Sequence, residues 1–490
     1  MSKKYRIVMI LTFIMIASAL LRYDAFVSTK NRLPINGSLI REGAAIGLYK
    51  GLGYRVYPIP NYRKTGNLID PEEYLQWQEN EAKKEKLKPY YLNPGPPTLL
   101  AVTYRLFSLK HKYYQIIQLA ITWMQILLIY YIGSRIFSST LSGMIAAFLY
   151  SISPYEMNYS LYISREIYVP SAFIVAIACS TYFVVNKKRK LWSKRNFIIA
   201  ILTGLWIGIC MHFKKPSFAW LLIIPIAIFP FVGIKRTFLW TACAFITCFI
   251  IIVPWMVRNK IVVNNFALSA ESGGLSFWAG IGGNGNAIGQ TLTDTVALNS
   301  IRMYMRLEGR SIKPFYQGGS KDFEEIGIKR AKQYIRENPN SYYNGFLKNL
   351  RENLINYTNW HYYNFWYAAV PYYNKSKKII GTKLYDIILK TWKRMIEIIP
   401  FVSIVGLVVA FAINANAYLL IIFISSAVVS LSLIVGGHCK YAYHILSVHY
   451  ICTGYVLSSV IKSIFEFYSM KQHKILNKLM FKSKIETIEP

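Results

Sequence analysis

Residues Ile250 to Gly289 read IIIVPWMVRNKIVVNNFALSAESGGLSFWAGIGGNGNAIG, and they divide the chain into two kinds of sequence. An apolar run ends at Pro254-Trp255, and Arg258 and Asn259 follow within about one helical turn. A tryptophan ring and a cation on a long apolar stem are the side chains that a membrane–water interface selects. Beyond them come glycines and amides without apolar periodicity. We therefore expect a membrane helix to leave the bilayer here and a long segment to begin in water.

The composition favours a polytopic membrane protein, because 54% of the 490 residues are hydrophobic and 16% are aromatic. The formal charge of +34 would suggest nucleic acid in a soluble protein. In a membrane chain it favours anionic membrane lipids or a phosphate-bearing lipid substrate, and a lysine-rich coding bias explains part of the excess. We expect no nucleic-acid partner.

The metal-binding residue types do not form a recognisable site. The six cysteines lie mostly in or beside apolar runs and form no CxxC pair, so we interpret them as packing residues. His438, His444 and His449 cluster late in the chain, where local packing is favoured over metal ligation. The sequence thus predicts no cofactor and no metal ligands, although a divalent metal is left open.

Apolar runs of helical length predict a mainly α fold with about ten transmembrane helices. The runs lie near residues 7–21, 116–137, 141–153, 168–185, 197–211, 218–233, 238–255, 401–413, 417–435 and 445–465. Pro225 and Pro230 should bend the sixth of these helices. Two shorter helices are expected over residues 38–50, stopped by Gly51, and within residues 92–107, in the membrane interface.

These runs divide the chain into four parts. The parts are an N-terminal transmembrane module (1–256) with a large first loop (22–114), a small exoplasmic domain (257–397), C-terminal transmembrane helices (398–470) and a basic tail (471–490). With ten spans, the short basic loop at 187–195 shares a side with both termini. The positive-inside rule makes that side the cytoplasm and places both long polar segments outside. We expect a bacterial inner (plasma) membrane.

Six short stretches of sequence stand in a particular order on the predicted outer side. They are GLGY (51–54), NPGPP (93–97), SREIY (164–168), FKKP (213–216), PWMVRN (254–259) and HCKYAYHI (438–445). Their order and common side resemble the landmarks of the GT-C superfamily of polytopic glycosyltransferases. The resemblance is greatest to the family 39 branch, which holds protein O-mannosyltransferases and lipid A aminoarabinose transferases. It implies transfer of a sugar from a polyprenyl-phosphate donor to a lipid, glycan or protein acceptor on the exoplasmic face.

That chemistry needs cations beside the lipid phosphate and a carboxylate beside the acceptor hydroxyl. Lys215, Arg258 and Lys440, with the neighbouring Tyr441, match the landmarks that would bind the substrate. Lys440 stands where the family carries Arg. Each cation has an alternative role as an interfacial anchor.

The catalytic base is where this chain departs from the family. The resemblance implies an Asp before the GLGY turn, but the matching position is Gly37. Glu42, on the helix that follows, is the first candidate, although a carboxylate early in a helix is also favoured by the helix dipole. Asp24 is the second candidate and has Arg22 as an alternative partner. Glu166 resembles the acid of the family's second loop.

Two other functions compete with a glycosyltransferase. Gly37 in place of the Asp favours a non-catalytic relative that binds or moves polyprenyl-linked glycans. A transporter is the other alternative, but the sequence shows neither repeated halves nor acids within the spans, which secondary transporters usually have.

Overall fold

The computed structural model describes most of the helical part of the chain. The described residues are 2–29, 38–56, 88–89, 93–153, 160, 165, 167–187, 190, 193–264, 266–268, 274–275, 277–278, 281, 294–310, 320–354, 398–399, 401–408 and 445–486. Nearly all of them are helical. The described strands, β1 (Arg55–Val56) and β2 (Lys88–Pro89), form one short antiparallel pair. The predicted mainly α fold is confirmed.

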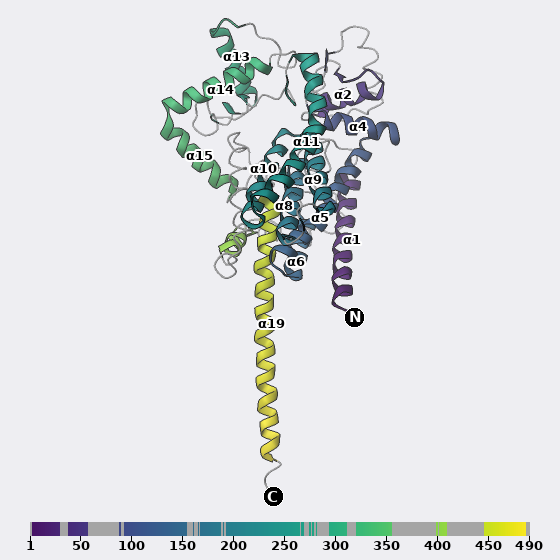
Figure 1. Cartoon of the computed structure of the whole chain (residues 1–490), viewed down its shortest axis with the longest axis vertical. Coiled ribbons are helices and arrows are strands. Elements are labelled where there is room, and N and C mark those ends of the chain that lie inside the picture. Colours follow the sequence, from purple (N-terminus) through teal and green to yellow (C-terminus); the bar gives the residue numbers. More distant parts are fainter. Residues whose placement is uncertain are drawn as a thin grey trace.

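Six of the described helices are long and apolar enough to cross a membrane. They are α1 (Lys3–Thr29), α5 (Lys112–Ile136), α8 (Tyr168–Val185), α9 (Lys194–Phe213), α11 (Ile234–Val263) and α19 (Ile445–Glu486). Two apolar helices between them are shorter, α6 (Thr140–Ser151) and α10 (Ala219–Val232). These eight helices coincide with eight of the expected spans, and they show a multi-pass membrane protein (Figure 1).

The lengths of three helices differ from the sequence expectation. At 1.5 Å per residue, the 12 residues of α6 cover about 18 Å, less than the roughly 30 Å of a hydrocarbon core. The 14 residues of α10 also fall short of that thickness. In contrast, α11 continues beyond Trp255 to Val263 and ends at Asn264, whose φ of 52° is left-handed. Of the last expected spans, residues 401–408 are helical and residues 417–435 lie outside the described part.

Glycines allow the membrane helices to approach closely. A Cβ on Gly204 of α9 would lie 2.1 Å from the Ala244 carbonyl oxygen of α11, and Gly208 faces the same helix one turn later. Gly454 of α19 packs in the same way against Ser142 of α6. Because lipid tails are as apolar as the helix surfaces, such close van der Waals contact is a main source of helix association in a bilayer.

Two short helices lie across one end of the bundle, which is the upper end in Figure 1. They are α2 (Ser38–Tyr49) and α4 (Gly95–Leu106), and both confirm the short helices expected there. They share a small core that includes Ile46, Leu100 and Tyr104. Gly51, with a φ of 78°, stops α2 as the sequence predicts. The N-terminal end of α1 and the C-terminal end of α19 point the opposite way (Figure 1).

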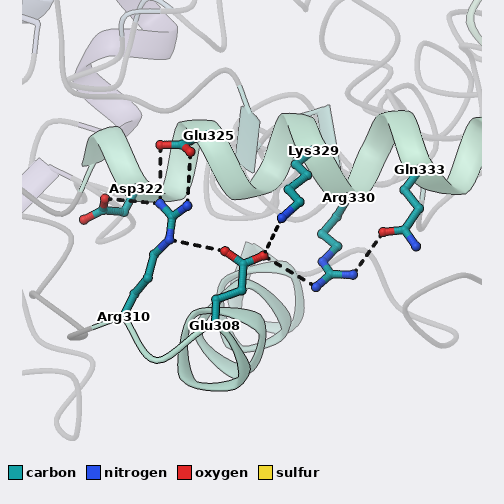
Figure 2. A network of polar contacts seen from close by, with 7 residues as sticks. All are labelled: Glu308, Arg310, Asp322, Glu325, Lys329, Arg330 and Gln333. Carbon is teal, nitrogen blue, oxygen red and sulfur yellow. Dashed lines mark hydrogen bonds and ion pairs between the residues drawn. The ribbon is translucent and has the colours of Figure 1, made fainter.

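The segment after α11 contains a separate three-helix unit, whose first two helices lie at the upper end and whose third runs downward from them (Figure 1). Its helices are α13 (Asp294–Leu307), α14 (Ser320–Glu337) and α15 (Pro339–Leu354). A core of its own, which includes Trp278, Ile301 and Phe323, holds the unit together. Figure 2 shows the polar network that joins α13 to α14 around Glu308.

Candidate functional site

Tyr54, Trp255 and Arg258 form an aromatic and cationic cluster at the upper end. Trp255 and Arg258 are three residues apart on α11 and therefore share a face of the helix. The rings of Tyr54 and Trp255 meet edge to face, with centroids 4.5 Å apart. The Arg258 guanidinium lies 4.7 Å from the Trp255 ring centroid and 5.6 Å from that of Tyr54. This is cation–π geometry with two rings, and Nη2 of Arg258 also donates to the Tyr54 carbonyl at 3.3 Å.

The Tyr54 hydroxyl extends this cluster to α4, where it bonds to the Thr98 hydroxyl. Burial raises the pKa of Tyr54 above its ordinary value, against the lowering effects of Thr98 and Arg258. Tyr54 therefore stays neutral at physiological pH, and the only charge that this cluster of three side chains carries is the guanidinium.

The NPGPP and FKKP landmarks meet beside this cluster. Asn93 is buried and its Nδ2 donates to the Phe213 carbonyl at 2.6 Å. Gly95 lies so close to Phe213 that a Cβ there would be 2.6 Å from the ring. The Phe213 ring also stacks on Tyr168, the last residue of SREIY, with centroids 3.5 Å apart.

His212 then connects α9 with α11. Its Nε2 lies 2.9 Å from the Ile251 carbonyl oxygen, about one helical turn before Trp255. Direct contacts thus join GLGY to PWMVRN, whose residues Tyr54 and Arg258 are 204 positions apart, and NPGPP to FKKP. The two pairs are linked through residues that adjoin the stretches, Thr98 after NPGPP and His212 with Ile251 before FKKP and PWMVRN.

Several buried polar atoms at the same end have no hydrogen-bond partner within the described part of the chain. Among them are Nε1 of Trp255, Nδ1 of His212 and the hydroxyl of Ser217. Ser217 belongs to η2 (Lys215–Phe218), the short helix that begins in FKKP. Buried polar atoms in native proteins are nearly always paired, so these atoms are consistent with a ligand that forms hydrogen bonds with them.

The remaining predicted substrate-binding residues are only partly described. Lys215 is half-buried at the start of η2, between the ends of α9 and α10. Lys440 and Tyr441 lie outside the described residues. The expected meeting of Lys215, Arg258 and Lys440 therefore stays a prediction.

Glu42 and Arg258 have different partners in the structure. It is buried on α2, where its Oε1 contacts Nε2 of His111 and accepts a 3.4 Å hydrogen bond from the Tyr104 hydroxyl. His111 immediately precedes α5, and Tyr104 belongs to α4. Sequence reasoning missed both partners, because neither lies near Glu42 in sequence nor in a landmark. The contacts join α2 to its neighbours on the side that faces α4 and α5.

The other two predicted acids are described less fully. The backbone of Asp24 is helical, in α1, but its side chain lies outside the described part. The whole of Glu166 lies outside the described part. Arg22, the alternative partner of Asp24, is buried and donates through Nη1 to the Ser151 carbonyl at 2.9 Å. Ser151 is the last residue of α6, so Arg22 lies where the helix dipole favours a cation.

The described residues contain no group of three His, Cys, Asp or Glu side chains that is arranged to hold a metal ion. His449 is buried and bonds through Nδ1 to the Ser403 hydroxyl, which is a packing environment. Cys179, Cys210, Cys243, Cys248 and Cys452 form no disulfide, and Cys439 lies outside the described part.

No family model matches this chain, and no curated protein matches it. Among solved structures, it is similar to the oligosaccharyltransferase AglB of Archaeoglobus fulgidus in complex with an inhibitory peptide and a dolichol-phosphate. The identity is 14% and the TM-score 0.45, over 96% of this chain and 52% of that chain. This chain thus spans about half the length of the archaeal enzyme. It is also similar to ArnT of Cupriavidus metallidurans bound to undecaprenyl phosphate, at 11% identity and a TM-score of 0.38, over 93% of this chain and 77% of that chain.

Proposed function

We propose that this chain is a membrane glycosyltransferase of the GT-C type, which transfers a sugar from a polyprenyl-phosphate donor to a lipid, glycan or protein acceptor. One observation carries the proposal. Four stretches that are each weak landmarks in sequence come together as two contacting pairs at the upper end of the bundle. GLGY contacts PWMVRN around Arg258, NPGPP contacts FKKP, and adjoining residues link the two pairs. In this proposal that end faces the exterior of a bacterial inner membrane, and both termini are cytoplasmic.

In this proposal Arg258 stabilises the lipid phosphate from which the sugar departs. A guanidinium offers several N–H donors in a fixed plane, which suits a phosphate group. The Tyr54 and Trp255 rings lie against the cation and shield it from water, and shielding strengthens its attraction to an anion. Lys215, Lys440 and Tyr441 would add contacts to the same substrate.

Acceptor activation is assigned to the acids. Glu42 is the first candidate for the base that takes the proton of the acceptor hydroxyl, and Asp24 is the second. Glu166 would orient the acceptor or a basic neighbour. Each acid needs to come within hydrogen-bond reach of the acceptor, about 2.6–3.2 Å between heavy atoms, in the productive complex.

Binding of the lipid phosphate is the direct test. The purified protein in lipid nanodiscs is titrated with undecaprenyl phosphate and, separately, with dolichol phosphate. Arg258→Ala should weaken binding of at least one of them roughly tenfold, because it removes a charge-assisted contact of about 1.5–3 kcal/mol.

Lys260→Ala is the matched control. Lys260 is a cation two residues further along α11, but it is exposed and donates to Asn264 Oδ1 at 2.8 Å. Its replacement should leave the affinity unchanged. Equal affinities of wild type, Arg258→Ala and Lys260→Ala would refute the phosphate site.

A non-catalytic relative that binds polyprenyl-linked glycans is the second candidate function. The contacts of Glu42 with His111 and Tyr104 favour this second candidate, because the carboxylate that would serve as the base is already bound by these two side chains. This candidate predicts lipid-phosphate binding without sugar transfer. Transfer of labelled sugar from any member of a panel of polyprenyl-phosphate donors would exclude it.

A further inference from the structure

The Asn259 side chain connects two parts of the molecule at the end of α11. It is 2% exposed, and its Oδ1 accepts a hydrogen bond from Arg258 Nη1 at 3.0 Å. Its Nδ2 donates to the Ala267 carbonyl at 2.9 Å and to the Leu268 carbonyl at 3.5 Å. One buried amide therefore holds the guanidinium of the candidate phosphate site and the first residues of the segment that follows α11.

The backbone is shaped to make this connection. The N–H of Asn264, in its left-handed conformation, bonds back to the Asn259 carbonyl. The chain then returns to Asn259, so that the buried side chain of Leu268 joins the main core of the bundle. The segment that leads to the three-helix unit thus begins docked on the end of α11.

We infer that Asn259 is a positioning residue that couples the direction of the Arg258 guanidinium to the placement of residues 266–268. The inference rests on the proposed function for its ligand, and it adds to that site a mechanical link with the exoplasmic segment. Arginine side chains carry about 2 kcal/mol of rotamer entropy, so holding the guanidinium before the ligand arrives lowers the cost of binding. A shift of the segment would change the direction of the guanidinium.

The chemistry of the amide explains why this position needs Asn. The amide oxygen accepts from Arg258 while the amide nitrogen donates to two carbonyls. An Asp of the same shape would accept from Arg258 but repel both carbonyls, and its charge would compete with a phosphate for the guanidinium. An Ala would make none of the three contacts.

The first experiment measures the coupling without any ligand. Hydrogen–deuterium exchange of residues 264–268 is followed in nanodiscs for wild type, Arg258→Ala, Asn259→Ala and the double variant. Arg258→Ala should speed exchange at 266–268 in the wild-type background and have no further effect when Asn259 is already Ala. Additive effects of the two replacements, or no effect of Arg258→Ala, would overturn the coupling.

The second experiment measures the affinity for undecaprenyl phosphate. Asn259→Ala should weaken it about three- to tenfold, and Asn259→Asp should weaken it more, with partial recovery below about pH 4, where the new carboxyl is protonated. A residue with only a structural role would give the two variants equal affinities and no pH-dependent recovery. Affinities equal to that of wild type in both variants would also overturn the inference.

Asn264→Gly is the control in both experiments, because glycine accepts the left-handed φ and Asn264 makes no described contact with Arg258. It should resemble wild type. An equal loss in this variant would show general fraying of the end of α11 and overturn the inference. If wild type does not bind undecaprenyl phosphate, the proposed ligand fails, and the exchange experiment alone decides the coupling.

Discussion

Arg22 and Arg258 illustrate how single cations are accommodated beside apolar surroundings. Arg22 donates to the last carbonyl of α6 and is supported by a helix dipole. Arg258 is supported by two aromatic rings and by the Asn259 amide. The first arrangement joins two helices, whereas the second lies among the landmark stretches. The partners of each cation therefore favour a structural role for Arg22 and a ligand-binding role for Arg258.

Glu42 is the residue at which catalysis is most directly tested. Glu42→Gln keeps the shape and removes the base, so sugar transfer should fall roughly 10²-fold or more if Glu42 activates the acceptor. Turnover of labelled donor is the measurement, and Asp24→Asn should have a smaller effect. Tyr104→Phe is the control, since it keeps the ring and the Glu42 carboxylate and removes the 3.4 Å hydrogen bond to Oε1. Unchanged transfer by a variant with both acids replaced would show that neither is the base.

At the scale of the elements, the contact between α9 and α11 determines where the FKKP and PWMVRN landmarks lie. Gly204 and Gly208 are four residues apart on α9, and both face α11. Their spacing is the small-xxx-small pattern that lets membrane helices approach closely. Any side chain at Gly204 would collide with the backbone of α11.

Gly204→Ala should therefore destabilise the bundle by about 1–3 kcal/mol or more, because the added Cβ would lie 2.1 Å from the Ala244 oxygen. The measurement is the midpoint of thermal unfolding in detergent. Leu205→Ala, at the neighbouring and exposed position, should change the midpoint little. The opposite ranking of these two variants would contradict the packing of α9 on α11.

We predict that the stability of the three-helix unit depends on pH through Glu308. A hydrogen bond from Lys329 is the largest cause that lowers the pKa of Glu308 below its ordinary 4.5, with Arg310 and Arg330 contributing (Figure 2). Since the folded pKa is lowered, the stability from Glu308 is present above pH 4.5 and is lost as the pH falls through the lowered value.

Glu308→Gln should remove this dependence. The protection factors of α13 and α14, which are exchange rates corrected for the intrinsic pH dependence of amide exchange, are measured between about pH 3 and 6. They should fall toward acid pH in wild type and fall less in the variant. Lys332→Gln, an exposed change on α14 outside the network in Figure 2, is the control and should behave as wild type. Identical pH profiles for Glu308→Gln and wild type would show that Glu308 does not cause the pH dependence of this unit.

At the scale of the whole molecule, the two ends of the chain lie opposite the candidate site. The N-terminal end of α1 and the C-terminal end of α19 point away from α2, α4 and the three-helix unit (Figure 1). This arrangement agrees with the parity of the basic loops in the sequence. We therefore predict that the candidate site is exoplasmic and that both termini are cytoplasmic.

Topology reporters give the measurement. Fusions at Trp192, in the basic loop, and at Tyr343, on the exposed surface of α15, should report opposite sides of the membrane. A fusion at the C-terminus should agree with that at Trp192. The same signal at Trp192 and Tyr343 would overturn the topology and remove the exoplasmic assignment of the site.

The sequence by itself determined the apolar helices of this protein, but not α13, α14 and α15 in the polar segment after α11. Eight expected spans, the short helices α2 and α4 and the stop at Gly51 follow from local patterns, because hydrocarbon excludes unpaired backbone groups and so requires long apolar helices. The landmark stretches could also be recognised from the sequence alone. Arg258 could be named as a candidate because it follows an apolar run directly.

The tertiary structure alone decided which residues meet. The partners His111 and Tyr104 of Glu42 are 69 and 62 positions away from it, and Tyr54 is 204 positions from Arg258. Such contacts depend on which helix faces pack together, and in a bilayer that choice rests on close steric fit between helices of similar hydrophobicity. A pattern along the chain specifies the apolar surface of each helix, but the fit between two helices is a property of the pair. The sequence therefore predicted the apolar helices and the landmarks, and the packing brought GLGY into contact with PWMVRN around Arg258 and NPGPP into contact with FKKP.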